Sequence, residues 1–120
     1  MAHNGMRKWT LAEQGVRLLD GRWTLAILAE LFDGGRRYQA LDEVLKGVSH
    51  KVLTETLRRA ERDGLIERRL DPERVETATI YELTDLGYSL SGPLDVLDSW
   101  AERNWSEVDR ARQLWRRRNV

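Results

Sequence analysis

The strongest constraint on the fold is the order of helix and turn signals between residues 34 and 64. Leucine and valine residues at helical spacing predict a helix from Tyr38 to Leu45, and Gly47 interrupts the pattern. Ser49, a preferred N-cap residue, then begins a second helix that runs to residue 62. The order of a helix, a tight glycine turn and a second helix predicts a helix-turn-helix.

Two strand candidates follow this pair of helices. Gly64 can adopt the left-handed conformation of a helix C-cap, and Leu65 to Leu70 and Thr77 to Leu83 are rich in residues that favour strands. The segment between them, residues 71–76, contains a proline and several acidic residues, which is typical of an exposed loop. The sequence therefore predicts a winged helix-turn-helix: a mainly α fold with a small β-hairpin wing and extra helices at both ends.

The second helix of the pair is amphipathic. On a helical wheel one side is apolar and must be buried, and the other side is rich in Lys, Arg and Thr. Lys and Arg can donate to guanine or to phosphate, and Thr can bond a base edge or contact a thymine methyl group. A purely solvated charged face is the alternative. The expected buried side consists of Val52, Leu53, Thr56, Leu57 and Ala60, and the expected reading side of Lys51, Thr54, Glu55, Arg58 and Arg62.

Other basic or polar residues flank the reading side. Arg36 and Arg37 precede the first helix, where its N-terminus is expected to approach the DNA backbone, and solvated loop arginines are the alternative. Tyr38 is expected to fill the core between the helices. The predicted phosphate contacts are Arg36, Arg37, Ser49, His50 and Arg74, and the predicted base-edge contacts are Lys51, Thr54 and Arg58.

The charge of the chain is unevenly distributed although its net charge is zero. Residues 34–70 carry nine Lys and Arg against six Asp and Glu, whereas residues 71–102 carry one cation against eight acidic residues. The local field, rather than the net charge, attracts phosphate. Double-stranded DNA is therefore the predicted partner of residues 34–70.

Length and composition exclude several other classes of protein. The 120 residues are predicted to form a single domain, residues 1–120, with a core that needs no disulfide. The chain contains no cysteine and two separated histidines, His3 and His50, so neither a metal site nor a cofactor is predicted. Residues 87–91 lack the last glycine of a nucleophile elbow, so no catalytic residue is predicted. Without a signal-like or membrane-spanning apolar stretch, a cytoplasmic location is expected.

Amphipathic helices are predicted on both sides of the winged segment. The helix from Trp23 to Phe32 is expected to close the core of the monomer. The N-terminal and C-terminal stripes, the latter kinking or restarting near Gly92 and Pro93, have no obvious surface of their own to cover. They are expected to form a homodimer whose two helix-turn-helix units bind the half-sites of a near-palindromic operator. The alternative is that these stripes close the core of the monomer itself. The predicted interface residues are Leu11, Leu18, Leu90, Leu94, Leu97 and Trp100.

Three of the five tryptophans lie in these terminal stripes. Aromatic side chains form the walls of apolar ligand pockets, but they are also enriched at protein interfaces. Trp9, Trp100 and Trp105 are therefore candidates for a site that binds a small aromatic effector, with interface packing as the alternative. The chain has no cysteine, so regulation by thiol oxidation is excluded. Control by a small ligand is consistent with this composition.

Six short motifs follow one another between residues 21 and 87. They are Gly21-Arg22-Trp23-Thr24, Gly34-Gly35-Arg36-Arg37-Tyr38, Gly47-Val48-Ser49, Leu53-Thr54 with Leu57, Gly64-Leu65-Ile66-Glu67-Arg68, and Tyr81-Glu82-Leu83-Thr84-Asp85-Leu86-Gly87. Each motif is weak alone, but their order and spacing together are specific. Over about residues 20 to 102 the chain resembles the HxlR family of bacterial winged-helix regulators, a branch near the MarR group.

The resemblance implies a homodimeric transcription factor whose recognition helix is the one that Ser49 caps, with dimerisation through the first and last helices. The chain departs from the family's pattern in two places. Many members carry a cysteine upstream of the first motif, and this chain has none. Where relatives often show Pro-Pro-Arg in the wing, this chain has Glu76-Thr77-Ala78, which leaves Arg74 as the wing's single cation. A winged-helix module that binds protein instead of DNA is the alternative function, and the basic reading side argues against it.

Overall fold

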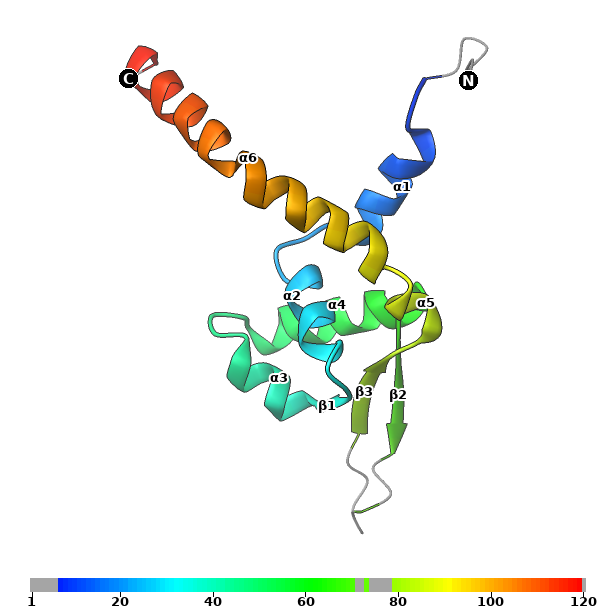
Figure 1. Cartoon of the computed structure of the whole chain (residues 1–120). Helices are drawn as coiled ribbons and strands as arrows, with labels where there is room; N and C mark the ends of the chain where they lie inside the picture. Colours follow the sequence, from blue (N-terminus) through cyan, green and yellow to red (C-terminus); the bar gives the residue numbers. More distant parts are fainter. Residues whose placement is uncertain (1–6, 71–72, 74–78, 120) are drawn as a thin grey trace. The chain divides into compact units, whose positions relative to one another are not determined.

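The computed structural model describes residues 7–70, 73 and 79–119, which form helices and a small antiparallel sheet (Figure 1). The chain divides into two compact units, residues 1–88 and residues 89–120. The first unit holds every element but one, and the last helix belongs to the second unit. In chain order the elements are α1 (Thr10–Leu18), α2 (Thr24–Leu31), β1 (Arg36–Arg37), α3 (Tyr38–Val44), α4 (His50–Arg62), β2 (Ile66–Leu70), β3 (Thr79–Leu83), α5 (Asp85–Tyr88) and α6 (Ser91–Arg118).

The helix pair α3 and α4 confirms the predicted helix-turn-helix. Ser49 is the N-cap of α4, and its hydroxyl oxygen accepts a hydrogen bond of 3.1 Å from the backbone N–H of Val52. At the other end, Gly64 has a φ of +78°. The N–H of Leu65 bonds the carbonyl of Ala60, and the N–H of Gly64 bonds that of Glu61, which is the Schellman arrangement. Both ends of α4 are therefore set by local sequence.

The sheet has three strands in the order β1-β3-β2, all antiparallel. The two predicted strands of the wing are present as β2 and β3. Arg36 and Arg37, for which no strand was predicted, form β1 and pair with Tyr81 and Ile80 of β3. A strand of two residues is too short to show an alternating pattern, so its pairing depends on β3, more than forty residues away in sequence.

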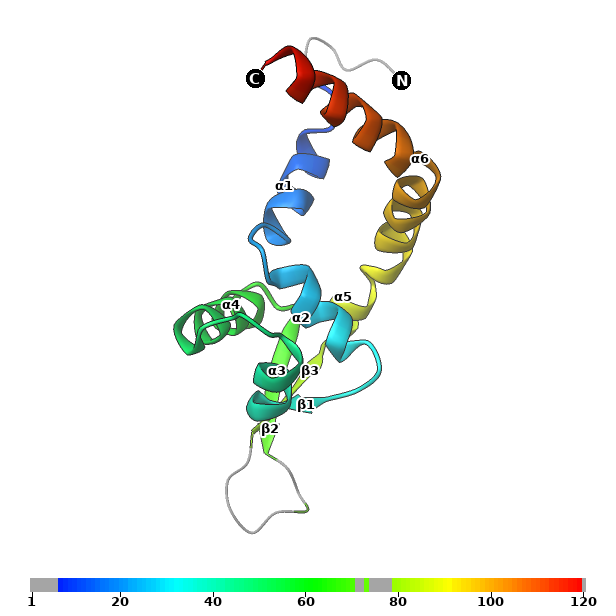
Figure 2. The ribbon, with the colours of Figure 1, turned by 90° about the vertical axis from the view of Figure 1, so that its left-hand side faces the viewer.

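The core of the first unit lies where α2, α3 and α4 pack together against the sheet (Figures 1 and 2). Each helix contributes leucines or isoleucines that are almost completely buried, as the amphipathic pattern predicts. Burial of each such side chain contributes about 1.5–3 kcal/mol through the hydrophobic effect. The buried core residues are Ile27, Leu28 and Leu31 of α2, Leu41 and Leu45 at α3, Leu53, Leu57 and Ala60 of α4, and Leu65, Ile66 and Leu83.

The connection from β3 into α5 is tightly packed around Thr84. Its hydroxyl donates to the carbonyl of Gly64 and accepts from the N–H of Gly87 at 3.1 Å. Gly87 is buried, and a Cβ added there would overlap the carbonyl oxygen of Leu65. This close approach fastens the start of α5 to the end of α4 and to β2.

The terminal helices α1 and α6 bury none of their residues. In α1, Leu11 is 79% exposed, although it lies on the predicted apolar stripe. In the second unit, α6 begins at Ser91, so the chain restarts next to Gly92 and Pro93 as expected. The helix then continues without interruption to Arg118. Among the described residues, no helix is long and apolar enough to cross a membrane.

Candidate nucleic-acid interface

The outward side of α4 carries the side chains that sequence analysis selected for reading DNA. Lys51, Glu55 and Arg58 are exposed and Thr54 is half-buried, whereas Leu53 and Leu57 on the opposite side are buried. Neither Lys51 nor Arg58 forms an ion pair with any residue that the structure describes. Two cations without an ion-pair partner, an intervening hydroxyl and the carboxylate of Glu55 therefore project from a capped helix.

Two residues of α4 differ from their predicted roles. Val52, expected on the buried side, is 38% exposed because it lies at the edge of the apolar stripe. Arg62, expected on the reading side, forms an ion pair with Asp63 at 3.1 Å. The cationic part of the reading side is therefore shorter than the wheel indicates and centres on Lys51 and Arg58.

Tyr38 joins α3 to the first turns of α4. Its hydroxyl donates to the carbonyl oxygen of His50 at 3.2 Å and lies 3.3 Å from the hydroxyl of Thr54. Either hydroxyl can be the donor of the bond between Tyr38 and Thr54. The Thr54 hydroxyl can therefore act as a donor or as an acceptor toward a base edge.

His50 is held from two sides at the first turn of α4. Its Nε2 atom lies 3.3 Å from a carboxylate oxygen of Asp42 in α3, and its ring meets the Tyr38 ring edge to face with centroids 5.9 Å apart. Sequence analysis selected His50 but not Asp42. No local signal marks Asp42, because its pairing depends on how α3 packs against α4.

The strands of the wing place their arginines in internal ion pairs. Arg68 bonds Glu61 at 3.0 Å, and Arg69 bonds Glu82 at 3.0 Å. The hydrogen bond and charge of Glu61 raise the pKa of Arg68. Burial raises the pKa of the neighbouring Tyr81, while Arg68 and Arg58 act in the opposite direction. These carboxylates compete with phosphate for Arg68 and Arg69, and Arg74, the predicted wing contact, lies outside the described residues.

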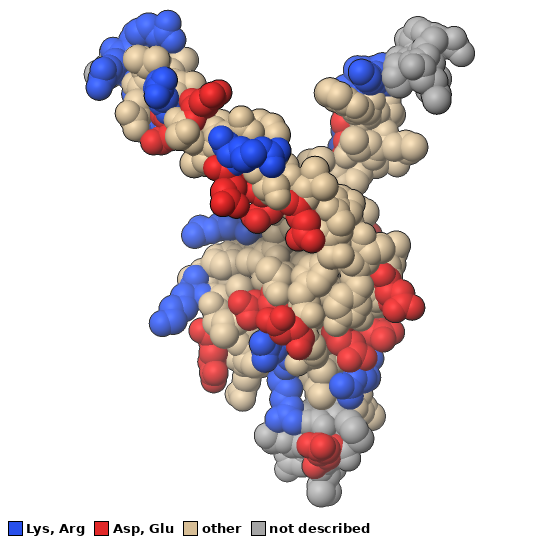
Figure 3. Space-filling model, in the orientation of Figure 1, with Lys and Arg blue, Asp and Glu red and all other residues tan. Residues whose placement is uncertain are grey.

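The two arginines of β1 lie beside the first helix of the pair. Arg36 is exposed and forms no ion pair with a described residue, and Arg37 is half-buried. Figure 3 shows Lys and Arg side chains interspersed with Asp and Glu around this part of the molecule. On the face that Figure 3 shows, these cations are separate side chains and do not form one broad basic surface.

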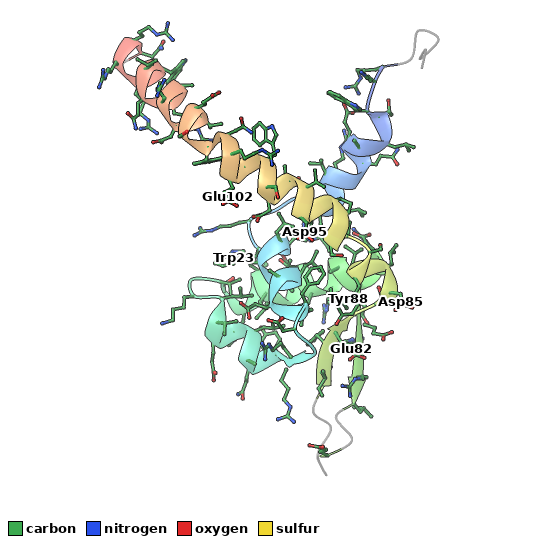
Figure 4. The ribbon with its side chains drawn as sticks, viewed as in Figure 1. Trp23, Glu82, Asp85, Tyr88, Asp95 and Glu102 are labelled. Atoms are coloured by element: carbon green, nitrogen blue, oxygen red, sulfur yellow. The ribbon has the colours of Figure 1, made fainter. Side chains whose placement is uncertain are left out.

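The tryptophans divide between the two units. Trp23 is half-buried at the start of α2 (Figure 4), and Arg22 stacks over its ring at 4.9 Å. Trp9 is 71% exposed and lines an open depression of about 530 Å³ on α1, with Lys8 5.3 Å from its ring centroid. Trp100 and Trp105 are each about half exposed on α6 in the second unit.

Loss of the Tyr38 hydroxyl tests the connection between α3 and α4. We expect Tyr38→Phe to weaken binding to a selected DNA site by about threefold to tenfold, because a net hydrogen bond is worth about 1 kcal/mol. The loss should be greatest for the base pair next to Thr54. Fluorescence anisotropy with matched and single-base variant duplexes measures it. The control is Tyr88→Phe, which removes a hydroxyl beside Phe32 and away from α4. If Tyr38→Phe binds DNA as tightly as Tyr88→Phe does, the role of Tyr38 is contradicted.

Fold and interface together define a winged helix-turn-helix protein of the DNA-binding class. The sequence model of the HxlR-like helix-turn-helix family matches residues 18–109. The chain belongs to this family, and it is a transcriptional regulator of the helix-turn-helix type.

Relatives of known sequence and structure agree with this assignment. The chain is 34% identical over 96 residues to the HTH-type transcriptional regulator YtcD of Bacillus subtilis, covering 80% of this chain and 75% of YtcD. It is 32% identical over 91 residues to YodB of the same organism, covering 76% and 80%. A MarR-family regulator from Enterococcus faecalis superimposes with a TM-score of 0.77 at 31% identity, covering 92% of this chain and 99% of that one. The reduced form of YodB gives a TM-score of 0.73 at 30% identity, covering 78% and 91%.

Proposed function

We propose that the protein binds a near-palindromic operator as a homodimer, with one α4 helix per subunit in the major groove. The observation that carries this proposal is the pair of cations without an ion-pair partner, Lys51 and Arg58, on the outward side of a capped, well-packed helix. Lys51, Thr54 and Arg58 would contact base edges. The phosphate contacts would be made by Arg36, Arg37, Ser49 and His50. The phosphate contact predicted for Arg74 lies outside the described residues and stays a prediction.

Exposed apolar side chains on the terminal helices support a homodimer. Leu11, Leu97 and Trp100 are each about half exposed or more, and Leu18 is 41% exposed. Leu90 and Leu94 are half-buried. Covering such side chains with a second copy would remove apolar surface from water, which is the main driving force for stable association. A two-fold dimer would place two α4 helices on half-sites about 34–36 Å apart.

The alternative of a protein-binding module has less support. Such a module gains nothing from free Lys and Arg on the outward side of α4, because unpaired cations are costly to desolvate at a protein interface. DNA accepts them without that penalty, since phosphate neutralises each cation and releases counterions.

Regulation by a small aromatic molecule is a further part of the proposal. Trp9, Trp100 and Trp105 present exposed rings, and the chain has no cysteine for thiol chemistry. An effector would act only by binding one dimer geometry more tightly than the other.

Selection of bound sequences from random duplex DNA tests the proposed function. We expect an enriched motif with two inverted half-sites one helical turn apart. The selected duplex then serves to test effectors, by tryptophan fluorescence quenching together with release of the duplex. Enrichment of no sequence would contradict operator binding, and enrichment of a single asymmetric half-site would contradict the palindromic dimer. Release by peroxide or diamide, but by no aromatic compound, would contradict the proposed effector.

A further inference from the structure

A carboxylate of α3 lies against the first residue of the recognition helix. Asp42 is in the last turn of α3, where a negative charge faces the negative end of the helix dipole, so the stability of α3 gives no reason for it. Its carboxylate oxygen is 3.3 Å from Nε2 of His50. The side chain of His50 is 74% exposed and that of Asp42 is 33% exposed. The imidazole is therefore accessible to a bound phosphate, while the carboxylate is mostly covered by protein.

The carboxylate fixes which ring nitrogen of His50 carries a proton. An ionised carboxylate can only accept hydrogen bonds, so Nε2 must be the protonated nitrogen in this contact. Nδ1 forms no hydrogen bond with a residue that the structure describes. In the neutral ring Nδ1 therefore keeps a lone pair, which accepts hydrogen bonds and donates none. Phosphate oxygens also only accept, so the neutral ring cannot bond a phosphate while it keeps its contact with Asp42.

The surroundings of His50 limit other orientations of the ring and other sources of charge. The Tyr38 ring meets it edge to face, and the Tyr38 hydroxyl donates to the His50 carbonyl at 3.2 Å. Among the described residues, Asp42 is the one carboxylate that pairs with His50. Lys46 lies in the turn before α4, and Lys51 follows His50 on the helix. Of these types of side chain, histidine alone ordinarily changes its charge between pH 5 and 8.

We propose that Asp42 is a positioning residue for DNA binding and that operator binding takes up a proton from solvent at His50. This inference rests on the proposed phosphate contact of His50 and adds its protonation state and its partner. When both ring nitrogens are protonated, Nε2–H donates to Asp42 and Nδ1–H donates to a phosphate oxygen. The imidazolium then joins two anions in the complex, whereas the free protein supplies one of them. The complex therefore favours the charged ring more than the free protein does.

Proton uptake determines the sign of the pH dependence. Low pH favours the state that binds more protons, so the affinity for DNA rises as the pH falls. We expect the dissociation constant for a selected duplex to increase by about tenfold for each bound subunit between pH 6 and pH 8, as for the loss of a hydrogen bond to a charged group. Fluorescence anisotropy at fixed ionic strength measures this change.

The two histidines of the chain provide a matched pair of variants. Glutamine is neutral at every pH, so we expect binding by His50→Gln to be nearly independent of pH. We expect His3→Gln to keep the dependence of the unmodified chain. Calorimetry in buffers of different ionisation enthalpy counts the protons directly. It should show net uptake near pH 7 for the unmodified chain and for His3→Gln, and almost none for His50→Gln.

Asp42→Asn tests the positioning role, because an amide donates as well as accepts. With an amide donor at Nε2, the neutral ring can carry its proton on Nδ1 and bond phosphate without a charge. We therefore expect Asp42→Asn to lose most of the pH dependence and to bind at pH 8 at least as tightly as the unmodified chain. A merely structural role of Asp42 would instead weaken binding by the same factor at every pH.

Nitrogen NMR of the free protein examines the same contact without DNA. We expect the neutral His50 ring to be protonated at Nε2 in the unmodified chain, and a share protonated at Nδ1 to appear in Asp42→Asn. His3→Gln assigns the signals. A neutral ring protonated mainly at Nδ1 in the unmodified chain would overturn the positioning role.

The binding outcomes separate this inference from the proposed function. A chain that binds no duplex at any pH would overturn operator binding and the inference together. Operator binding with the same pH dependence in the unmodified chain and in His50→Gln would overturn the inference alone. Full retention of the pH dependence by Asp42→Asn would likewise leave operator binding intact and remove the role of Asp42.

Discussion

Replacement of Gly87 by alanine is expected to lower the free energy of unfolding by about 3 kcal/mol. The added Cβ would overlap the carbonyl oxygen of Leu65, which belongs to the backbone and cannot rotate away. The Cβ would also lie 3.1 Å from a side-chain carbon of Leu83. Relief requires α5 to move away from β2, which would strain the hydrogen bond from the Thr84 N–H to the Leu65 carbonyl.

Urea unfolding followed by circular dichroism measures this effect. We expect a lower midpoint with an unchanged slope, since the unfolded surface stays the same. Gly15→Ala in α1 is the matched control, because a Cβ at that position would meet no atom of a neighbouring element within 4 Å. Alanine favours a helix over glycine by up to about 1 kcal/mol, so the control should be neutral or slightly stabilising. A Gly87→Ala midpoint equal to that of the unmodified protein would contradict the close approach.

Removal of either free cation on the outward side of α4, Lys51 or Arg58, is expected to have the largest effect on DNA binding. Lys51→Ala or Arg58→Ala should cost about 1–3 kcal/mol with a selected duplex if the side chain bonds a base edge. A phosphate contact would instead weaken binding to all sequences alike and reduce the slope of the salt dependence by about one unit. Fluorescence anisotropy with selected and scrambled duplexes over a range of salt concentrations distinguishes the two cases.

Arg62→Ala is the matched control for this experiment. Arg62 lies on the same helix, but Asp63 already neutralises its guanidinium. We expect its loss to change binding by less than about 0.5 kcal/mol, as for most surface substitutions. If Lys51→Ala and Arg58→Ala bind like the Arg62→Ala control, the outward side of α4 is not the reading surface.

The wing is expected to contribute little to binding through its strands. Arg68 and Arg69 each have a carboxylate partner at 3.0 Å, so a phosphate contact would first have to break an ion pair. A free cation on α4 needs no such exchange. We therefore expect Lys51 and Arg58 to supply the larger share of the electrostatic attraction to DNA.

Local sequence by itself determined the helix-turn-helix and its boundaries. The Ser49 cap, the left-handed Gly64 and the helical spacing of Leu53 and Leu57 act within a few residues of one another. Their physical causes, capping and amphipathic burial, can therefore be read along the chain. The family motifs extend the same local signals over most of the chain.

Tertiary structure decided the features that join distant segments. Three contacts connect residues that lie at least sixteen positions apart in the sequence. They are the strand pairing of Arg36 with Tyr81, the contact of Tyr38 with Thr54 and the close approach of Gly87 to Leu65. The pairing of Arg68 with Glu61 depends in the same way on how β2 runs back along α4. Spacing in the sequence cannot specify these contacts, because they form only when the core brings helices and strands together. The packing of β2 along α4 thus determines that Arg68 is neutralised, whereas Arg62 is paired with its neighbour in sequence.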